Sequence, residues 1–219
     1  MVLCLMLVAC GPSTPTNGGG ELENPNAAQH TWLEQTEDTT VAPSLSLACS
    51  DLNGTKENSW YRMFSLKEMG VTGPLTVHRV NFGVQTAIGD QRVKVSIGTY
   101  AGDYGAVELD TSKIDVLGLT TIAIPEATGE LMQANFPAIT VAAETNLIVE
   151  VKTEGVGDGR FFYLGATTGT ETMPGYLRAP TCNTPNPTMT SALGYSQTHL
   201  IITVSGAFTP APSIENPVP

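Results

Sequence analysis

The chain has 219 residues, of which 14% are charged, and 21 acidic against 10 basic side chains give a formal net charge of −11. This balance argues against nucleic acid and anionic lipid headgroups as partners, because phosphate binding needs clustered cations and the lysines and arginines are scattered singly along the sequence. The 22 glycines and 15 prolines disfavour long exposed helices and favour short strands joined by tight turns.

An apolar run opens the chain and ends at a cysteine. It is too short for the ~20 residues of a membrane span but has the ~7–15 residues of a signal h-region. Leu7-Val8-Ala9-Cys10 resembles the lipobox of bacterial lipoproteins, although no Lys or Arg precedes the apolar run. The resemblance implies that residues 1–9 are a signal peptide and that the Cys10 sulfur carries diacylglycerol. Gly11 after the cysteine implies sorting to the outer membrane. An ordinary secretory signal is the alternative.

Composition divides the remainder into three parts. Residues 10–42 are interpreted as the lipidated N-terminus and a flexible tether, because the Gly/Ser/Thr/Pro-rich stretch has no apolar period with which to offset chain entropy. Residues 43–208 are long enough to form one domain with its own core. The Pro-rich residues 209–219 are predicted to be a loose tail.

Apolar and polar residues alternate in short runs within the predicted domain. In residues 92–97, for example, Val93, Val95 and Ile97 alternate with polar side chains. Period-two alternation of β-branched residues is typical of a strand with one face in the core and the other in water. Similar runs occur at residues 80–84, 122–124, 139–141, 147–151, 161–163 and 200–204.

These runs predict an all-β fold with roughly eight to ten strands in an antiparallel β-sandwich of jelly-roll or Ig-like connectivity. Leu75 and Val77 are out of phase with Val80 and Phe82, which predicts a β-bulge near His78. No internal repeat is evident, which argues against a propeller or a solenoid.

Two of the four cysteines remain after processing at the lipobox. Cys4 leaves with the signal peptide and Cys10 takes the lipid, so Cys49 and Cys182 are an even pair in an oxidising compartment. We therefore predict one disulfide between them. The alternative is a pair of buried free thiols.

Two stretches of the domain, Ser59–Leu66 and Phe162–Cys182, resemble β-sandwich modules of secreted multidomain bacterial proteins, which often occur beside hydrolase domains. The resemblance covers about residues 43–208. It implies an accessory module, and it carries no activity and no binding residues over to this chain.

No local motif indicates catalysis. The three histidines, His30, His78 and His199, belong to no His-Glu-x-x-His pair, and no Gly-x-Ser-x-Gly elbow is present. His199, just before an apolar strand, is interpreted as a structural imidazole. The sequence therefore predicts a protein that is not an enzyme, and a hydrolase site assembled only in the fold is the alternative.

One loop carries alternating oxygen ligands. Asp51, Asn53, Thr55 and Glu57 surround Gly54, and Ca²⁺ accepts six to eight such oxygens. These residues indicate a possible calcium site. An Asn-Gly turn between two strands explains the same residues without a metal.

Aromatic side chains are the remaining signal for binding. Tyr100 and Tyr104 flank a short loop and are expected to be exposed, where they could contact a sugar or a peptide. Trp60 is a further candidate, although it shares a strand face with Phe64 and could equally belong to the core.

Together these observations predict a lipid-anchored extracytoplasmic β-sandwich that acts as a binding or adhesion module for glycan or protein at the bacterial cell envelope. The ligand is expected at loops on one end of the sandwich. An envelope hydrolase and a purely structural lipoprotein are the alternatives.

Overall fold

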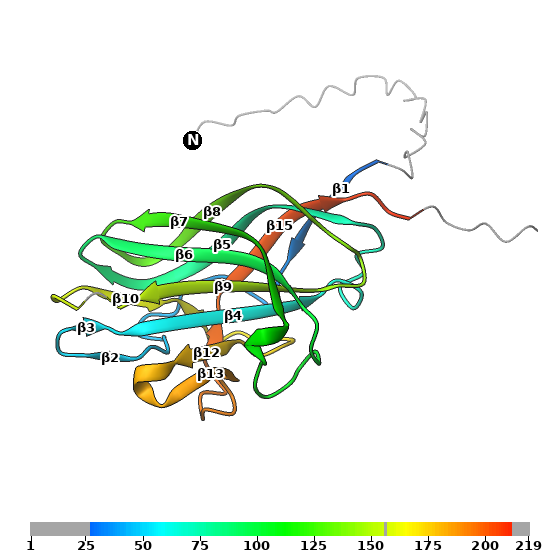
Figure 1. Ribbon diagram of the computed structural model, residues 1–219. Helices are drawn as coiled ribbons and strands as arrows, with labels where there is room; N and C mark the ends of the chain where they lie inside the picture. Colours follow the sequence, from blue (N-terminus) through cyan, green and yellow to red (C-terminus); the bar gives the residue numbers. More distant parts are fainter. Residues whose placement is uncertain (1–26, 156, 212–219) are drawn as a thin grey trace, which may run out of the picture.

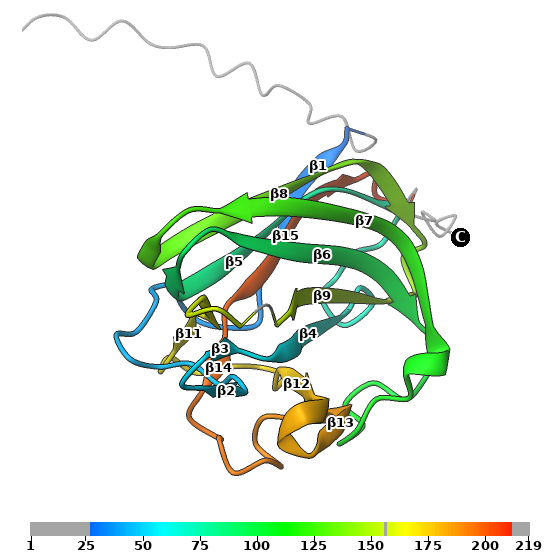
Figure 2. The same cartoon turned by 60° about the vertical axis from the view of Figure 1, so that its left-hand side comes forward.

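A computed structural model of the chain describes residues 27–155 and 157–211. Its regular secondary structure is almost entirely β, and most of the strands belong to two large sheets (Figures 1 and 2). In the five-stranded sheet, β5 pairs with β8 along one edge and with β15 and then β10 along the other, and β1 pairs with β15. The bounds are β1 (Gln29–Leu33), β5 (Leu75–Ile88), β8 (Ala127–Val141), β10 (Phe161–Leu164) and β15 (Ile202–Phe208).

The second sheet has six strands in the order β13-β12-β4-β9-β6-β7. Their bounds are β4 (Glu57–Ser65), β6 (Gln91–Tyr100), β7 (Ile114–Ile124), β9 (Asn146–Glu154), β12 (Tyr176–Ala179) and β13 (Thr184–Met189). Two short pairs and two 3₁₀ turns complete the described chain: β2 (Ser50–Asp51) with β3 (Gly54–Thr55), β11 (Ala166–Thr167) with β14 (His199–Leu200), η1 (Thr111–Lys113) and η2 (Pro180–Cys182).

Every pairing between these strands is antiparallel, so the prediction of an all-β antiparallel sandwich is confirmed. The two sheets have more strands than the eight to ten expected, because β1, β12 and β13 lack a clear period-two pattern. In β13, Pro185 and Pro187 obscure the strand signal, and proline is tolerated there because β13 lies at the edge of its sheet.

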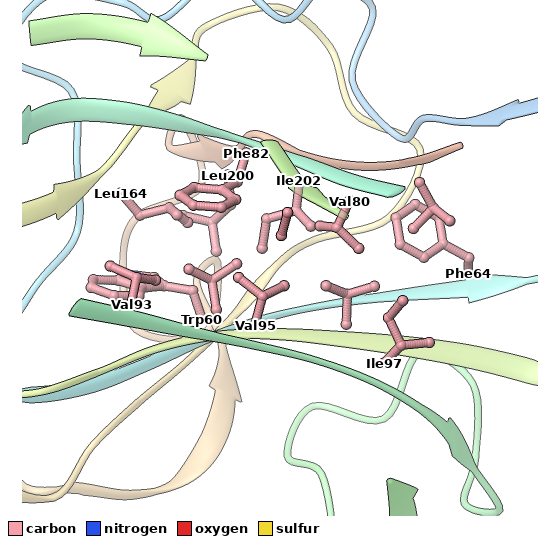
Figure 3. Close-up of a cluster of buried hydrophobic side chains, with 14 of the residues drawn as sticks. Trp60, Phe64, Val80, Phe82, Val93, Val95, Ile97, Leu164, Leu200 and Ile202 are labelled. Carbon is pink, nitrogen blue, oxygen red and sulfur yellow. The ribbon is translucent and has the colours of Figure 1, made fainter. Parts of the chain in front are cut away.

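The core lies between the two sheets. Successive side chains of a strand point to opposite faces, so the inward positions of β4 and β6 carry Trp60, Phe64 and Val95, and those of β5 and β15 carry Phe82 and Ile202. Figure 3 shows these side chains meeting between the sheets. Their burial supplies the main favourable term in folding.

Three strands meet at one point of the five-stranded sheet. The amide of Gly83 donates to the carbonyl of Ile201 (3.0 Å), the amide of Gly165 donates to Gly83 (2.8 Å), and the amide of Ile201 donates to Gly165 (3.0 Å). A Cβ on Gly165 would lie 2.9 Å from the carbonyl carbon of Gly83. This three-strand junction therefore needs glycine for close approach of the backbones, not for an unusual turn.

The predicted bulge near His78 is confirmed, because the register of β5 against β8 shifts between Val77 and Arg79. This shift returns the apolar side chains of both halves of β5 to the core. Within the described residues, no helix has the length and apolarity needed to cross a bilayer.

The predicted start of the domain at residue 43 is wrong. Gln29–Leu33 form β1, and the segment 34–42 after it is bonded back to the domain, as in the hydrogen bond from the Ala42 amide to the Ala166 carbonyl (2.8 Å). Leu33 and Gln35 are buried. The short strand has too few residues for a visible period, so its apolar residues were not recognised as core.

Several sequence predictions lie outside the described residues. These are the signal peptide, the lipidated Cys10, the tether up to residue 26, and residues 212–219 of the predicted tail. The predicted Cys49–Cys182 disulfide is described and confirmed, with a Cα–Cα distance of 5.8 Å. It links the segment before β2 to η2.

We expect the disulfide to contribute substantially to stability, because it closes a loop with a sequence separation of 133 residues. The double variant Cys49→Ser/Cys182→Ser should lower the free energy of unfolding by about 2–5 kcal/mol. Guanidinium unfolding measures this difference. Reductant should lower the stability of the unmodified protein by a similar amount and leave that of the variant unchanged; equal stability of the two proteins would contradict the prediction.

Candidate functional site

A cleft of about 720 Å³ opens at one end of the sandwich. Its walls come from the start of β6, the ends of β7 and β9, and the segment just before β10. These segments lie at the same end of the molecule (Figure 1). The sequence predicts a ligand at loops on one end of the sandwich, and this cleft lies at such an end.

Three cationic side chains line the cleft. Arg92 and Lys94 come from the outward face of β6, and Arg160 comes from the segment before β10. The chain has only 10 basic residues and a net charge of −11, so three at one cleft are a marked concentration. The cations that lie scattered along the sequence are therefore not all scattered in the folded protein, where three of them line one cleft.

Local structure explains how the three cations converge. Arg92 and Lys94 are two residues apart on one strand, so both point to the same face of the sheet. The turn before β6 contains Gly89, whose φ of +68° favours glycine, and a Cβ there would lie 2.9 Å from Cγ of Arg160. Glycine thus allows both the turn and the close packing of the Arg160 side chain.

Three carboxylates lie in or beside the cleft, as many as its cations, but they engage the cations unequally. Glu154 is hydrogen-bonded to Lys94, and this ammonium holds the pKa of the Glu154 carboxyl below its usual range. Arg160 lies 3.9 Å from the exposed Asp158, and Arg92 forms no ion pair with any residue in the described part of the chain. Asp90 is the second carboxylate of the lining.

The cleft can bind an anion and contact the rest of an extended ligand. A guanidinium offers a planar set of donors that matches a carboxylate bidentately, which suits Arg92 and Arg160. Thr121 adds a hydroxyl, and Ala123 and Pro125 add apolar surface. This combination is able to hold one acidic group and to pack against the chain that carries it.

The two carboxylates of the predicted calcium loop are engaged by cationic side chains. Asp51 pairs with Lys56 at 2.6 Å, and Glu57 pairs with Arg178 at 2.6 Å. The hydrogen bond from Arg178 and the nearby Lys152 lower the pKa of the Glu57 carboxyl. These carboxylates already have cationic partners, and no group of three or more His, Cys, Asp or Glu is arranged for a metal among the described residues.

The other two residues of that loop have structural roles. Asn53 donates its amide to Asp51 within the β2–β3 turn, and Thr55 is buried with its hydroxyl bonded to the backbone of Phe162. The turn interpretation of this segment agrees with the geometry, whereas calcium binding would require Asp51 and Glu57 to leave their cationic partners.

The three predicted aromatic ligands are not exposed platforms. Trp60 is fully buried, and its indole donates to the Leu47 carbonyl at 2.6 Å. Tyr100 is buried beneath its own loop, where its hydroxyl accepts from the Asp110 amide, and Tyr104 is half-buried and bonded to Gln35. Trp60 and Tyr100 are thus structural, and the prediction that they bind a ligand at the surface is wrong.

His199 does have an acidic neighbour, which sequence analysis did not identify. Nδ1 of His199 lies 2.7 Å from Glu171, whose other oxygen lies 2.8 Å from Nη2 of Arg62. Arg62 is fully buried and also donates to the Leu200 and Met173 carbonyls. Burial lowers the pKa of Arg62, and the Glu171 carboxylate opposes that effect. This buried charge cluster joins β4, β14 and the segment before β12.

Comparisons with protein-family models, with curated proteins and with solved structures find no match for the chain.

The sequence offered one partial signal for the cleft. Arg92 and Lys94 occupy the outward positions of a run that was recognised as a strand. Arg160 is distant in sequence: the Thr55 amide bonds its carbonyl (3.1 Å), and its side chain lies against the turn at Gly89. The folded arrangement was needed to recognise the site.

We expect Glu171→Gln to destabilise the protein by about 3–5 kcal/mol, because it removes the anionic partner of a fully buried arginine. Glu154→Gln is a matched control: its ion pair with Lys94 is exposed, so the substitution should leave the free energy of unfolding nearly unchanged. Urea unfolding of both variants measures the difference. Equal effects of the two substitutions would show that the buried charge cluster is not important for stability.

Proposed function

We propose that the protein is a lipid-anchored binding module of the bacterial cell envelope that holds an acidic glycan in the cleft at one end of its sandwich. The observation that carries the proposal is the convergence of two guanidinium groups on one cleft of a strongly acidic chain. Arg92 has no ion pair among the described residues, and Arg160 has only a long one, 3.9 Å from the exposed Asp158. Such a ligand carries carboxylates for the guanidinium groups and hydroxyls for the neighbouring threonines.

The size and composition of the cleft support a glycan over other anions. Two available guanidinium groups are few for nucleic acid, which needs many phosphate contacts. The volume of about 720 Å³ lies within the range of small-molecule sites and exceeds the space that a single inorganic anion needs. Ala123 and Pro125 provide apolar surface for the C–H groups of sugar rings.

We propose binding without catalysis. The nearest resemblance to an acid–base pair is His199 with Glu171, and both side chains are about nine-tenths buried, away from the cleft. Glu171 is also committed to Arg62. These features support a structural role for His199, in line with the sequence interpretation.

The anchor is proposed from the lipobox resemblance at Cys10. Two or three acyl chains make release from a membrane slow, whereas one chain binds only marginally. The Cys49–Cys182 disulfide supports an oxidising, extracytoplasmic location.

Substitution of the two guanidinium groups tests the cleft. Arg92→Ala/Arg160→Ala should weaken binding of a carboxylated polysaccharide such as polygalacturonate by about tenfold or more, because hydrogen bonds to charged groups contribute ~1.5–3 kcal/mol. Affinity electrophoresis at low and high ionic strength measures the loss. Binding by the unmodified protein should weaken as salt increases.

Lys67→Ala/Lys113→Ala is the matched control, because it removes the same charge from exposed positions at the opposite end of the sandwich. This control should retain the affinity of the unmodified protein. Equal loss in both double variants would indicate a non-specific charge effect and would refute the cleft as the binding site. Binding of envelope proteins and of no polysaccharide would favour a protein partner.

Cys10→Ala tests the anchor. In native cells, the variant should move from the membrane fraction to the soluble envelope fraction, because no thiol remains to accept diacylglycerol. Fractionation followed by immunoblotting measures this change, and Cys4→Ala is the control because that residue precedes the proposed cleavage point. Full membrane retention of Cys10→Ala would overturn the lipoprotein proposal.

A further inference from the structure

A half-exposed tryptophan lies on the outer face of the five-stranded sheet. Trp32 belongs to β1 and is 46% exposed. It lines a shallow groove of about 260 Å³. Trp32 lies within the predicted tether, but in the structure it is part of a folded surface.

The groove combines apolar and polar side chains. Thr203 and Ile201 are buried and form its base, next to the half-buried Asn81. Trp32 and the exposed Leu131 of β8 provide apolar surface at its sides. Glu34 and Thr39, from the segment after β1, add a carboxylate and a hydroxyl.

The indole of Trp32 is held in place before any ligand arrives. His30 contacts it edge-on, with ring centroids 5.8 Å apart and an interplanar angle of 66°. His30 is itself positioned by Ser205, whose Oγ lies 3.2 Å from Nε2 of the imidazole. A pre-positioned aromatic ring loses little conformational entropy on binding, which favours recognition of a rigid partner.

The polar groups of the groove are also ordered. Nδ2 of Asn81 donates to Oγ1 of Thr203 at 3.3 Å, which orients the amide oxygen of Asn81 as an acceptor. No lysine or arginine lines this groove, and its one charged side chain is the carboxylate of Glu34. The groove therefore repels anions and offers acceptors to hydroxyl groups.

We infer that this groove binds a neutral sugar ring of a glycan chain, with one C–H face of the ring against Trp32 and its hydroxyl groups against Asn81, Thr203 and Glu34. Its chemistry differs from that of the cationic cleft, and it lies on the other sheet. The inference does not depend on the cleft and can hold or fail separately.

The two tryptophans of the chain make the test direct. Trp60 is fully buried and Trp32 is 46% exposed, so acrylamide quenching of the protein reports mainly on Trp32. Cellohexaose, maltohexaose, mannohexaose and chitohexaose are titrated into the full chain in turn. We expect at least one of these neutral probes to change the emission and to protect Trp32 from acrylamide.

Variants assign the response to the groove. Trp32→Ala should lower the affinity for the responding probe at least tenfold, measured by calorimetry, and Trp32→Phe should retain part of it. Tyr195→Ala is the matched control, because Tyr195 is an aromatic residue of similar exposure, 48%, that lies outside the groove, and its removal should leave affinity unchanged. Urea unfolding verifies that each variant is folded.

Failure of the groove is distinguishable from failure of the cleft. The inference is overturned if no neutral probe protects Trp32 in the unmodified protein, which requires no variant to fold. It is also overturned if Trp32→Ala binds as tightly as the unmodified protein, or if Arg92→Ala/Arg160→Ala abolishes binding of the neutral probe while Trp32→Ala does not. Retained neutral-probe binding in that double variant, with loss in Trp32→Ala, supports the groove.

Discussion

The meeting of three strands at Gly83, Gly165 and Ile201 is the constraint on which the arrangement of the molecule depends. β5 is long, and one of its edges is shared by β15 over the first half and by β10 over the second. The backbone groups where these partners change lie inside the protein and still need hydrogen bonds, which the junction supplies. Without Cβ atoms at the two glycines, the three backbones can approach. From the junction, β15 runs on to contribute Thr203 to the Trp32 groove. The start of β10, with Arg160 just before it, lies beside the cationic cleft.

The fold was largely predictable because apolar and polar residues alternate along a strand wherever one face of the sheet is buried and the other is exposed to solvent. This alternation was clear in residues 92–97 and near the bulge at His78. The disulfide was predictable because Cys49 and Cys182 were the two cysteines left for the mature domain. The alternation was not visible where the strand is short or contains proline. β1 has five residues and β13 contains two prolines, so neither shows the alternation. Arg62 lies in a strand that is buried almost throughout, and no sequence pattern indicates that a charged residue will be enclosed with Glu171 and His199.

The candidate sites were less predictable, because each is assembled from residues distant in sequence. Aromatic residues near a glycine-rich loop suggested binding, yet Tyr100 is covered by that loop and Trp60 fills the core. Trp32, the more exposed of the two tryptophans, stood in a stretch without any period. Charge was misleading for a similar reason. An overall count describes how the chain interacts with solvent and says little about the local potential. Arg92 and Arg160 illustrate the difference: they converge on a cleft in a protein whose net charge is −11.

The position of β1 also has a mechanical consequence. It is an edge strand held to β15 by five residue pairs, beginning with Gln29 opposite Phe208, and it is the first strand of the described chain. A pull on the residues before Gln29 is therefore transmitted to these few pairs before it reaches the core. Force directed away from the sheet separates them one after another, whereas force along the strand loads all of them together and meets greater resistance. Because Trp32 lies on this strand, tension that peels β1 away would also dismantle the groove, so the grip on a bound chain would depend on the direction from which it is pulled.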